Sequence, residues 1–443
     1  MKVLRRNGRM TAIMSWPRQV NVQQQWGWFQ WASVSGLTTL EDISFKNVDH
    51  SLIEAFIVHW HPETNSFHFP WGEMTITLHD VYMLLGLRVD GQTMLTPFDD
   101  HTRKEYLMHS FGYTSQELTN CTRGVHHVKF DDKARDLSRQ QGVSPMVLES
   151  AYLYSLIGAV FINDRSTSHI PLWVLDFICD HNVTGVYAWG AGFLAYLYRQ
   201  LGESSREGMA TIGGCTGLLQ FWIWAHFPQF APRASGVDVR VDSRWARQWE
   251  DPRTPERSMT MVRSHINDID SMRAEDVTFM PYKGFLLDFD DVLSVSRYRG
   301  LLTIGDIKEP YMPDRVLRQF GYVQGVPSPR IKPIVEERPH NGTLRLQFSS
   351  DDDMWLRRRE VASMISLQGA PRARTPWQVS SDYMDWFTAH GHPFVLSTSM
   401  TRVPPVLPPI HLIDARVCKL TPSTIYYIVD TVITYYLTLL LFF

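Results

Sequence analysis

Cysteine is scarce in this chain, which has four among its 443 residues: Cys121, Cys179, Cys215 and Cys418. They stand far apart in the sequence and form no C-x-x-C pair. Zinc ribbons and disulfide-stabilised secreted domains both need a framework of closely spaced cysteines, so this pattern argues against both classes. It is typical of a protein that stays in a reducing compartment.

A strong net charge and a secretory signal are also missing. The 43 Lys and Arg residues nearly balance the 46 Asp and Glu residues, which leaves a formal net charge of −3. This balance gives no global attraction to DNA, RNA or an anionic membrane, although local basic clusters can still bind them. Residues 1–16 carry charge without an apolar core, which argues against a secretory signal.

Long apolar runs are rare, and the clearest one ends the sequence. Residues 424–443, TIYYIVDTVITYYLTLLLFF, are long and apolar enough to span a bilayer. Asp430 would cost about 2.5–3.5 kcal/mol at the centre of a membrane and less near the interface. Two interpretations stay open with equal weight: a membrane anchor, or foreign sequence from a truncated or mis-spliced gene model.

The chain does contain enough apolar residues for a large core, since 44% of its residues are hydrophobic and 12% are aromatic. Residues 145–162 are apolar on nearly every side, which is typical of a buried helix. Similar runs recur at residues 171–178, 189–201 and 216–227. We expect residues 145–227 to form the helical centre of a mainly α (α+β) domain.

A small β-hairpin is predicted in the N-terminal third. Residues 66–69 and 74–77 are short extended runs, and Pro70-Trp71-Gly72 between them supplies turn residues. Thr77 stands where a helix N-cap is expected, and Gly86 stands where that helix would end. The next three residues, 87–89, predict a further strand.

The hairpin stretch and several later blocks together carry a family resemblance. They are GEMTITL at 72–78, DVYMLLGLRVDG at 80–91, YAWG at 187–190, AYLYR at 195–199, IGGC at 212–215, LLQ at 218–220 and PDRVLRQFG at 313–321. In this order the blocks resemble the plant mobile domain family, also labelled aminotransferase-like. Phe69 and Trp71 depart from the family pattern, and the resemblance covers about residues 40–330.

The resemblance implies a non-catalytic interaction module of the nucleus, with a transposon-associated origin. It also implies roles in meristem maintenance, genome integrity and the silencing of transposable elements. Protein partners are therefore expected, whereas the net charge gives no support for a nucleic-acid partner. The aminotransferase-like label would require a lysine and a phosphate-binding loop for pyridoxal phosphate, and the sequence contains neither in a suitable context, so we expect no cofactor.

The sequence suggests five regions. They are an N-terminal arm (1–40), the helical domain (41–325), a Pro/Arg-rich linker with a short helix (326–376), a terminal aromatic helix (377–392) and the apolar tail (424–443). The linker is inferred from its composition. The tail makes a membrane-tethered scaffold an alternative function.

Cys215 is the candidate nucleophile. Residues 213–217, GGCTG, fit a cysteine version of the nucleophile elbow, which needs a base and an acid close to the thiol. His226 lies about three helical turns further on, too far along one helix to serve as that base. We therefore expect Cys215 to be a buried residue at a helix start and keep a Cys215-dependent hydrolase as an alternative.

Two further motifs are ambiguous. Gly190, Gly192 and Ala195 fit the dinucleotide fingerprint G-x-G-x-x-A, but no alternation of strands and helices surrounds them. Small residues that let helices pack closely explain them better. Residues 77–87 imitate the first half of a helix-turn-helix, but no second helix follows, so we expect a helix packed under the hairpin.

Histidines near the hairpin suggest a metal site only weakly. His59, His61, His68 and Glu73 have ligand chemistry but no established ligand spacing, and the pair His126-His127 is equally unsupported. We expect ordinary polar or half-buried side chains at these positions and predict no metal site.

Arginines form two candidate anion-binding groups. Arg315 and Arg318 are spaced i and i+3, which could grip a phosphate or an acidic partner, but an exposed, salt-bridged helix is the simpler expectation. The second group could serve nuclear import or nucleic-acid contact and is a weak signal: Arg357, Arg358, Arg359, Arg372 and Arg374.

Overall fold

The computed structural model describes most of residues 48–391. The described residues are 37, 48–119, 121, 124–162, 169–180, 184–205, 212–233, 245–249, 257–283, 290–337, 345–348, 354–360, 364–365, 367 and 370–391. The chain divides into two units, Met1–Leu396 and Ser397–Phe443, and all described residues belong to the first. The predicted arm (apart from Leu37) and the predicted tail lie outside the described residues.

Helices dominate the described residues and the sheets are small, which confirms the predicted mainly α fold with a hairpin sheet. The α-helices are α3 (His50–Ile57), α4 (Leu78–Leu85), α5 (Asp100–Phe111), α6 (Ser115–Leu118), α7 (His127–Ser138), α8 (Pro145–Val160), α10 (Trp189–Ser204), α11 (Thr216–His226), α12 (Met259–Ser271), α13 (Asp290–Ser296) and α14 (Tyr383–His390). The 3-10 helices are η3 (Leu172–Phe177), η4 (Pro228–Phe230), η5 (Trp245–Gln248), η6 (Ala274–Asp276) and η7 (Pro313–Phe320).

The strands form one three-stranded sheet and three two-stranded ladders among the described residues. The sheet has the order β1-β2-β3, and the ladders are β4-β5, β6-β7 and β8-β9. Their bounds are β1 (Trp60–His61), β2 (Ser66–Phe69), β3 (Gly72–Met74), β4 (Val125–His126), β5 (His169–Ile170), β6 (Gly300–Ile304), β7 (Ile307–Tyr311), β8 (Val335–Glu337) and β9 (Arg345–Gln347).

The predicted hairpin is present, but its second strand ends earlier than expected. β2 pairs antiparallel with β3, with His68 opposite Glu73 and Phe69 opposite Gly72. The predicted strand at residues 74–77 is therefore wrong beyond Met74. The Gln319 amide takes the place of a further strand, because it accepts from the Thr75 backbone N–H at 3.0 Å and donates to the Thr75 carbonyl at 2.9 Å.

Helix α4 begins and ends where the sequence predicts. Thr77 and Asp80 form a capping box, and Gly86 ends the helix with a left-handed φ of 69°. The strand predicted at residues 87–89 is wrong, because this segment joins no ladder. The Arg88 carbonyl instead accepts a hydrogen bond from the backbone N–H of Gly190 at 2.7 Å, so the segment docks on the start of α10.

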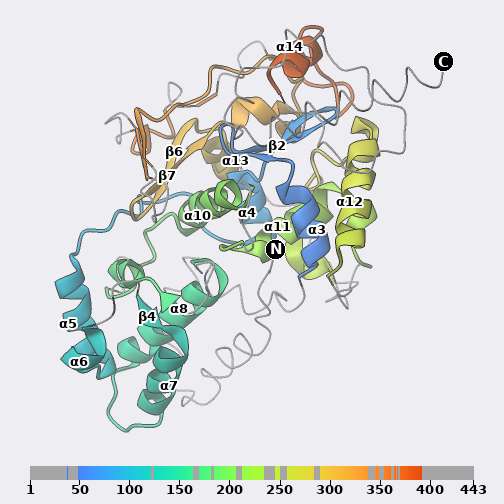
Figure 1. The fold of residues 1–443 in the computed structure, drawn as a ribbon. Coiled ribbons are helices and arrows are strands. Elements are labelled where there is room, and N and C mark those ends of the chain that lie inside the picture. The colour runs from blue at the N-terminus through green and yellow to red at the C-terminus, as the bar shows by residue number, and fades with distance from the viewer. Residues whose placement is uncertain are drawn as a thin grey trace, which may run out of the picture. The chain divides into compact units, whose positions relative to one another are not determined.

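The predicted helical centre is confirmed by α8, η3, α10 and α11. Helix α10 lies in the middle of the fold and packs against α4, β6 and β7 (Figure 1). Every side of α10 is buried, and this includes the polar residues near its C-terminal end, Arg199, Gln200, Glu203 and Ser204. This helix therefore links the hairpin region to the β6-β7 ladder.

Two groups of helices surround this centre (Figure 1). Helix α12 runs alongside α3 in one group, whereas α5 and α7 form the second group and contact each other and α8 of the centre. Phe56 on α3 lies at the centre of an aromatic cluster whose rings meet it edge to face: Phe67, Phe69, Trp222, Phe227 and Phe230. Such pairs add about 0.5–1.5 kcal/mol each beyond their burial.

The C-terminal part of the described chain contacts the hairpin region. Backbone hydrogen bonds join Val323 to Pro371 and Gln324 to Gln378, so the described residues of the predicted linker touch the body. Residues 354–360 consist mainly of turns. Helix α14 occupies the predicted terminal aromatic helix, and Tyr383 and Phe387 on it are buried.

None of the helices in the described part of the chain combines the length and hydropathy that a bilayer crossing needs.

Gly91 provides a test of this packing. Its φ is +143°, and an added Cβ would lie 2.3 Å from the Val186 carbonyl oxygen. We expect Gly91→Ala to lower the free energy of unfolding by about 3 kcal/mol or more, because backbone strain and a backbone clash add together. Urea unfolding followed by circular dichroism measures this change.

Gly112→Ala is the matched control. Gly112 also has a positive φ, +65°, but an added Cβ would meet nothing within 4 Å. The expected cost is that of the left-handed conformation alone, about 1–2 kcal/mol. Equal losses for the two variants would contradict the close approach of residues 91 and 186.

Candidate functional site

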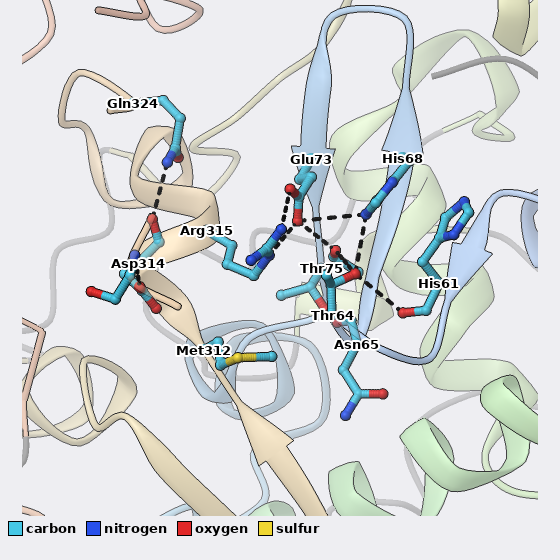
Figure 2. A network of polar contacts seen from close by, with 12 residues as sticks. His61, Thr64, Asn65, His68, Glu73, Thr75, Met312, Asp314, Arg315 and Gln324 are labelled. Carbon is cyan, nitrogen blue, oxygen red and sulfur yellow. Dashed lines mark hydrogen bonds and ion pairs between the residues drawn. The ribbon is translucent and has the colours of Figure 1, made fainter. Parts of the chain in front are cut away.

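A buried ion pair joins the hairpin to η7 (Figure 2). Arg315 Nε donates to Glu73 Oε2 at 2.6 Å, and Arg315 Nη2 donates to Glu73 Oε1 at 2.7 Å. Glu73 is 1% exposed and Arg315 is 7% exposed. Charges this deeply buried are tolerated only when a partner and hydrogen bonds replace the lost water. The pair therefore fixes the position of η7 against the hairpin.

The expectation that Arg315 and Arg318 lie exposed on a surface helix is wrong. Both are buried, and η7 is an irregular 3-10 helix with a kink at Val316 (φ −133°, ψ 41°). Arg318 donates to the Trp71 carbonyl at 2.9 Å, and its guanidinium lies 4.6 Å from the centre of the Phe279 ring. Burial lowers the pKa of Arg318, and an arginine nevertheless keeps its charge in proteins.

Helix α14 lies against this network. The Tyr383 hydroxyl accepts a hydrogen bond from the Glu73 backbone N–H at 3.3 Å, and the Arg315 guanidinium stands 5.6 Å from the centre of the Trp386 ring. Burial raises the pKa of Tyr383 to about 12, and the charge of Glu73 adds to the shift. Helix α14 is thereby tied to the same ion pair as the hairpin.

The structure gathers three of the four residues that we considered as metal ligands near the hairpin. His68 Nε2 lies 3.7 Å from Glu73 Oε2, and the His61 ring stacks on the His68 ring with centroids 4.0 Å apart. His59 is separate and bonds the Asp270 carboxylate at 3.1 Å. Within the described ranges, no group of three or more His, Cys, Asp or Glu is placed to hold a metal ion.

A pocket of about 340 Å³ opens beside the turn that joins β1 to β2. Its walls come from segments far apart in the chain: Pro62, Glu63, Asn65, Tyr198, Arg199, Gly202, Glu203, Glu309, Pro310, Arg330, Ile331, Lys332, Pro333, Ile334 and Phe348. Asn65, Arg199, Glu203 and Glu309 are each at most 4% exposed and form a polar floor. The rim carries the exposed side chains of Glu63, Lys332 and Ile334.

Hydrogen bonds hold the floor of the pocket in place. Arg199 Nε pairs with Glu309 Oε1, and Asn65 Nδ2 donates to Glu309 Oε2 and to the Pro310 carbonyl, each at 3.0 Å. Asn65 Oδ1 is buried and has no hydrogen-bond partner among the described residues. Such an unpaired buried acceptor costs about 1–3 kcal/mol.

The electrostatics of the floor depend on Glu309. Burial raises its pKa and the nearby Glu203 raises it further, while Arg199 and the Asn65 amide act in the opposite direction. The raised pKa means that the ionised form of Glu309 is less stable in the floor than it would be in water.

Comparison with known proteins decides the family. The family model described as "Plant mobile domain" matches residues 36–388, which is most of the chain. The chain belongs to the plant mobile domain family. No solved structure matches it.

Relatives of this plant mobile domain come from Arabidopsis thaliana. The chain is 28% identical to "Protein MAINTENANCE OF MERISTEMS" over 87% of this chain and 78% of that protein. It is 27% identical to "Protein MAIN-LIKE 2" over 83% of this chain and 56% of that protein. It is also 28% identical to "Serine/threonine-protein phosphatase 7 long form homolog" over 80% of this chain and 27% of that protein.

A second buried polar cluster of the domain surrounds Asp80. Its Oδ2 accepts hydrogen bonds from the N–H and hydroxyl of Thr77, and its Oδ1 accepts from His226 Nε2 at 2.9 Å and from the Tyr282 hydroxyl at 3.0 Å. Burial alone would raise the pKa of Asp80, but His226 and Thr77 outweigh it and lower the pKa. The cluster joins α4, α11 and the segment after α12.

Cys215 lies at the N-cap of α11 and is 2% exposed, which confirms a buried position at a helix start. His226 lies eleven residues further along the same helix, about 16 Å away at 1.5 Å per residue. Its ring nitrogens face the Asp80 carboxylate and the Thr278 carbonyl. The structure therefore does not bring the His226 imidazole to the Cys215 thiol.

The glycines of the dinucleotide-like motif lie inside α10 and pack closely, as expected. A Cβ at Gly190 would lie 2.9 Å from Val89 Cγ1, and one at Gly192 would lie 2.6 Å from Met94 Sδ. No helix follows α4 before residue 100, so the segment lacks the second helix of a helix-turn-helix. His126 and His127 stand at the junction of β4 and α7 with their rings stacked.

Some arginines of the second candidate group (Arg357, Arg358, Arg359, Arg372 and Arg374) contact other residues of the domain. Arg358 and Arg359 both donate to the carboxylate of Asp90, which lies near the end of the DVYMLLGLRVDG block at residues 80–91. The Arg372 guanidinium lies 4.2 Å from the centre of the Tyr322 ring. These contacts tie the 354–360 segment to the Asp90 turn.

The sequence did not predict the floor of the pocket. Asn65, Arg199 and Glu309 were not among the candidate site residues. The signal for Arg199 was limited to a charged residue that directly follows the apolar residues 189–198, with Gln200 and Glu203 close behind it. No local pattern points to Asn65 and Glu309, since they are 244 positions apart.

Breaking the ion pair between Glu73 and Arg315 should strongly lower the free energy of unfolding. Glu73→Gln leaves the Arg315 charge buried without its partner, and we expect a loss of about 3–5 kcal/mol in the free energy of unfolding. Replacing both, Glu73→Gln with Arg315→Met, should recover part of that loss, because no unpaired charge remains. Urea unfolding of the single and double variants checks both results.

Asp132→Asn provides the control. Asp132 pairs with Arg135 at 2.9 Å, but their side chains are 61% and 35% exposed. Removing an exposed pair should cost only about 0.2–1 kcal/mol. If the loss at Asp132 matched the loss at Glu73, burial would not be the source of the effect.

The titration of His79 should make the free energy of unfolding depend on pH. Burial lowers its pKa to about 4, whereas an unfolded histidine titrates near about 6.5. Between these values the unfolded chain binds a proton that the folded chain does not, so the free energy of unfolding should decrease as the pH falls from about 6.5 to about 4. His79→Gln should lose less stability than wild type between about pH 7 and about pH 5, as measured by urea unfolding.

The control for His79 is His109→Gln, since His109 is exposed on α5. This variant should show the pH dependence of the wild-type chain. An unchanged slope in His79→Gln would count against the role of His79.

Proposed function

We propose that this plant mobile domain is a non-catalytic protein-interaction module. The observation that carries the proposal concerns the polar side chains of the GEMTITL and DVYMLLGLRVDG blocks, which are buried and bond distant parts of the chain. Glu73 bonds Arg315, Thr75 bonds Tyr198, and Asp80 bonds His226. Side chains used in this way hold the fold together and do not face a substrate.

The occurrence of the domain in longer proteins supports the same proposal. The match to the phosphatase-named relative covers 80% of this chain but only 27% of that relative. A region of this kind therefore stands beside further sequence there, as expected of a module that is combined with different partners. The phosphatase activity in that printed name is not part of what we propose for this chain.

We infer a nuclear role in meristem maintenance, genome integrity and silencing of transposable elements. The support is membership of the family and the match to the relative named MAINTENANCE OF MERISTEMS, which covers 78% of that protein. In this role the domain would act by holding partner proteins together.

Genetic rescue tests the non-catalytic role. In a plant line lacking this gene, we expect the full chain and Cys215→Ser to restore meristem growth equally, because Cys215 is a buried helix cap far from His226. Melting temperatures of both proteins confirm folding. A folded Cys215→Ser protein that fails to rescue would favour the Cys215-dependent hydrolase.

Localisation and partners are tested with biotin-ligase and fluorescent fusions of the full chain. We expect nuclear signal and labelled nuclear proteins, with and without residues 424–443. Carbonate-resistant pelleting that is lost on deletion of the tail would favour the membrane-tethered scaffold instead.

A further inference from the structure

The pocket beside Asn65 has a preorganised floor. Asn65 adopts a left-handed φ of 47°, a conformation that asparagine tolerates better than most residues. Its amide nitrogen donates to both Glu309 and the Pro310 carbonyl, and these two acceptors fix which side of the amide carries the oxygen. Figure 2 shows this side chain extending away from the Glu73 network.

The buried side chains of the floor carry more carboxylates than guanidinium groups. Among its buried side chains, two carboxylates, Glu203 and Glu309, face one guanidinium, Arg199. Asn65 is 2% exposed, and its Oδ1 has no hydrogen-bond partner among the described residues. A cation that donates hydrogen bonds complements this arrangement, whereas an anion would meet two carboxylates.

The raised pKa of Glu309 agrees with this reading of the floor. Burial and the charge of Glu203 both disfavour its ionised form. A bound cation would reverse that effect, since an opposite charge within a few ångströms favours the ionised carboxylate.

The rim has the opposite character. Arg330 and Lys332 supply positive charge, exposed Glu63 supplies one negative charge, and Ile331, Pro333 and Ile334 supply apolar surface. Ile334 is 69% exposed. A peptide that carries acidic and apolar residues around a basic one can contact Arg330, Lys332 and the apolar rim as well as the carboxylates of the floor.

The size of the pocket limits the ligand. Its volume of about 340 Å³ is at the lower end of the range for small-molecule sites. It can hold one long side chain, but a dinucleotide is too large.

We propose that this pocket binds a basic side chain, arginine or lysine, of a partner protein, presented on a segment with neighbouring acidic and apolar residues. The inference rests on the proposed role as an interaction module and adds the chemistry of the segment that is recognised. The carboxylates of the floor would bind the basic side chain, and the exposed side chains of the rim would contact the residues next to it.

Peptide binding to the purified full chain tests the proposal without any mutation. The probe is fluorescein-labelled Asp-Leu-Arg-Leu-Asp, and the control replaces its arginine by citrulline, which has the same shape and no charge. We expect the arginine peptide to bind at least about ten-fold more tightly in fluorescence anisotropy, and a lysine peptide to bind better than the citrulline control. Equal affinity for arginine and citrulline, or no binding at millimolar peptide, would overturn the proposal.

Variants of the protein test the two layers separately. Glu203→Gln should weaken binding of the arginine peptide at least about ten-fold, whereas Glu275→Gln, an exposed residue outside the pocket, should leave it unchanged. Lys332→Glu should weaken the acid-flanked peptide more than a peptide with asparagine in place of aspartate. Because Lys332 is exposed, this variant remains informative if Glu203→Gln does not fold.

The results of these experiments test the pocket proposal and the interaction-module proposal separately. If biotin-ligase labelling gives the same partners for the wild-type chain and for a folded Lys332→Glu variant, and the peptides do not bind, the module role stands and the pocket is not its docking site. If the wild-type chain labels no partners, the module role fails whatever the pocket binds.

Discussion

The need to neutralise a buried carboxylate shapes the centre of this domain. Glu73 projects from a short hairpin into an interior with almost no solvent access, where an unpaired charge would cost several kcal/mol. Arg315 meets it with two hydrogen bonds from a position 242 residues later in the chain. Tyr383, Arg318 and Ser66 pack around the pair, so the hairpin, η7 and α14 are held together at one point.

The same principle is repeated at Asp80 and at Glu309. Each carboxylate is buried, and each is satisfied by groups from other elements: His226 and Tyr282 in one case, Arg199 and Asn65 in the other. Polar networks of this kind favour a single arrangement of the segments, because a partly satisfied network is worse than none. Among the described residues, these networks join elements that lie far apart in the chain, and Asn65 Oδ1 in the pocket floor is one of the buried acceptors that stay unpaired.

Local sequence rules predicted a good part of the fold. The hairpin, the Thr77 cap, the Gly86 terminus and the buried helices follow from turn chemistry, capping and hydrophobic periodicity, which act over a few residues. The errors have one cause. The strands expected at residues 74–77 and 87–89 were replaced by contacts to Gln319 and Gly190, which no local pattern reveals.

What the sequence alone determined is therefore the set of elements, the mainly helical class and the family to which the chain belongs. Only the tertiary structure decided which charges are buried. Arg315 and Arg318 have the spacing of an exposed face, and a free helix would turn them to water. They are buried because the hairpin brings a carboxylate and backbone carbonyls to them, and Asn65 and Glu309 form a pocket floor for the same reason. An ion pair depends on where its partner lies in space, and that position is set by the packing of the whole chain.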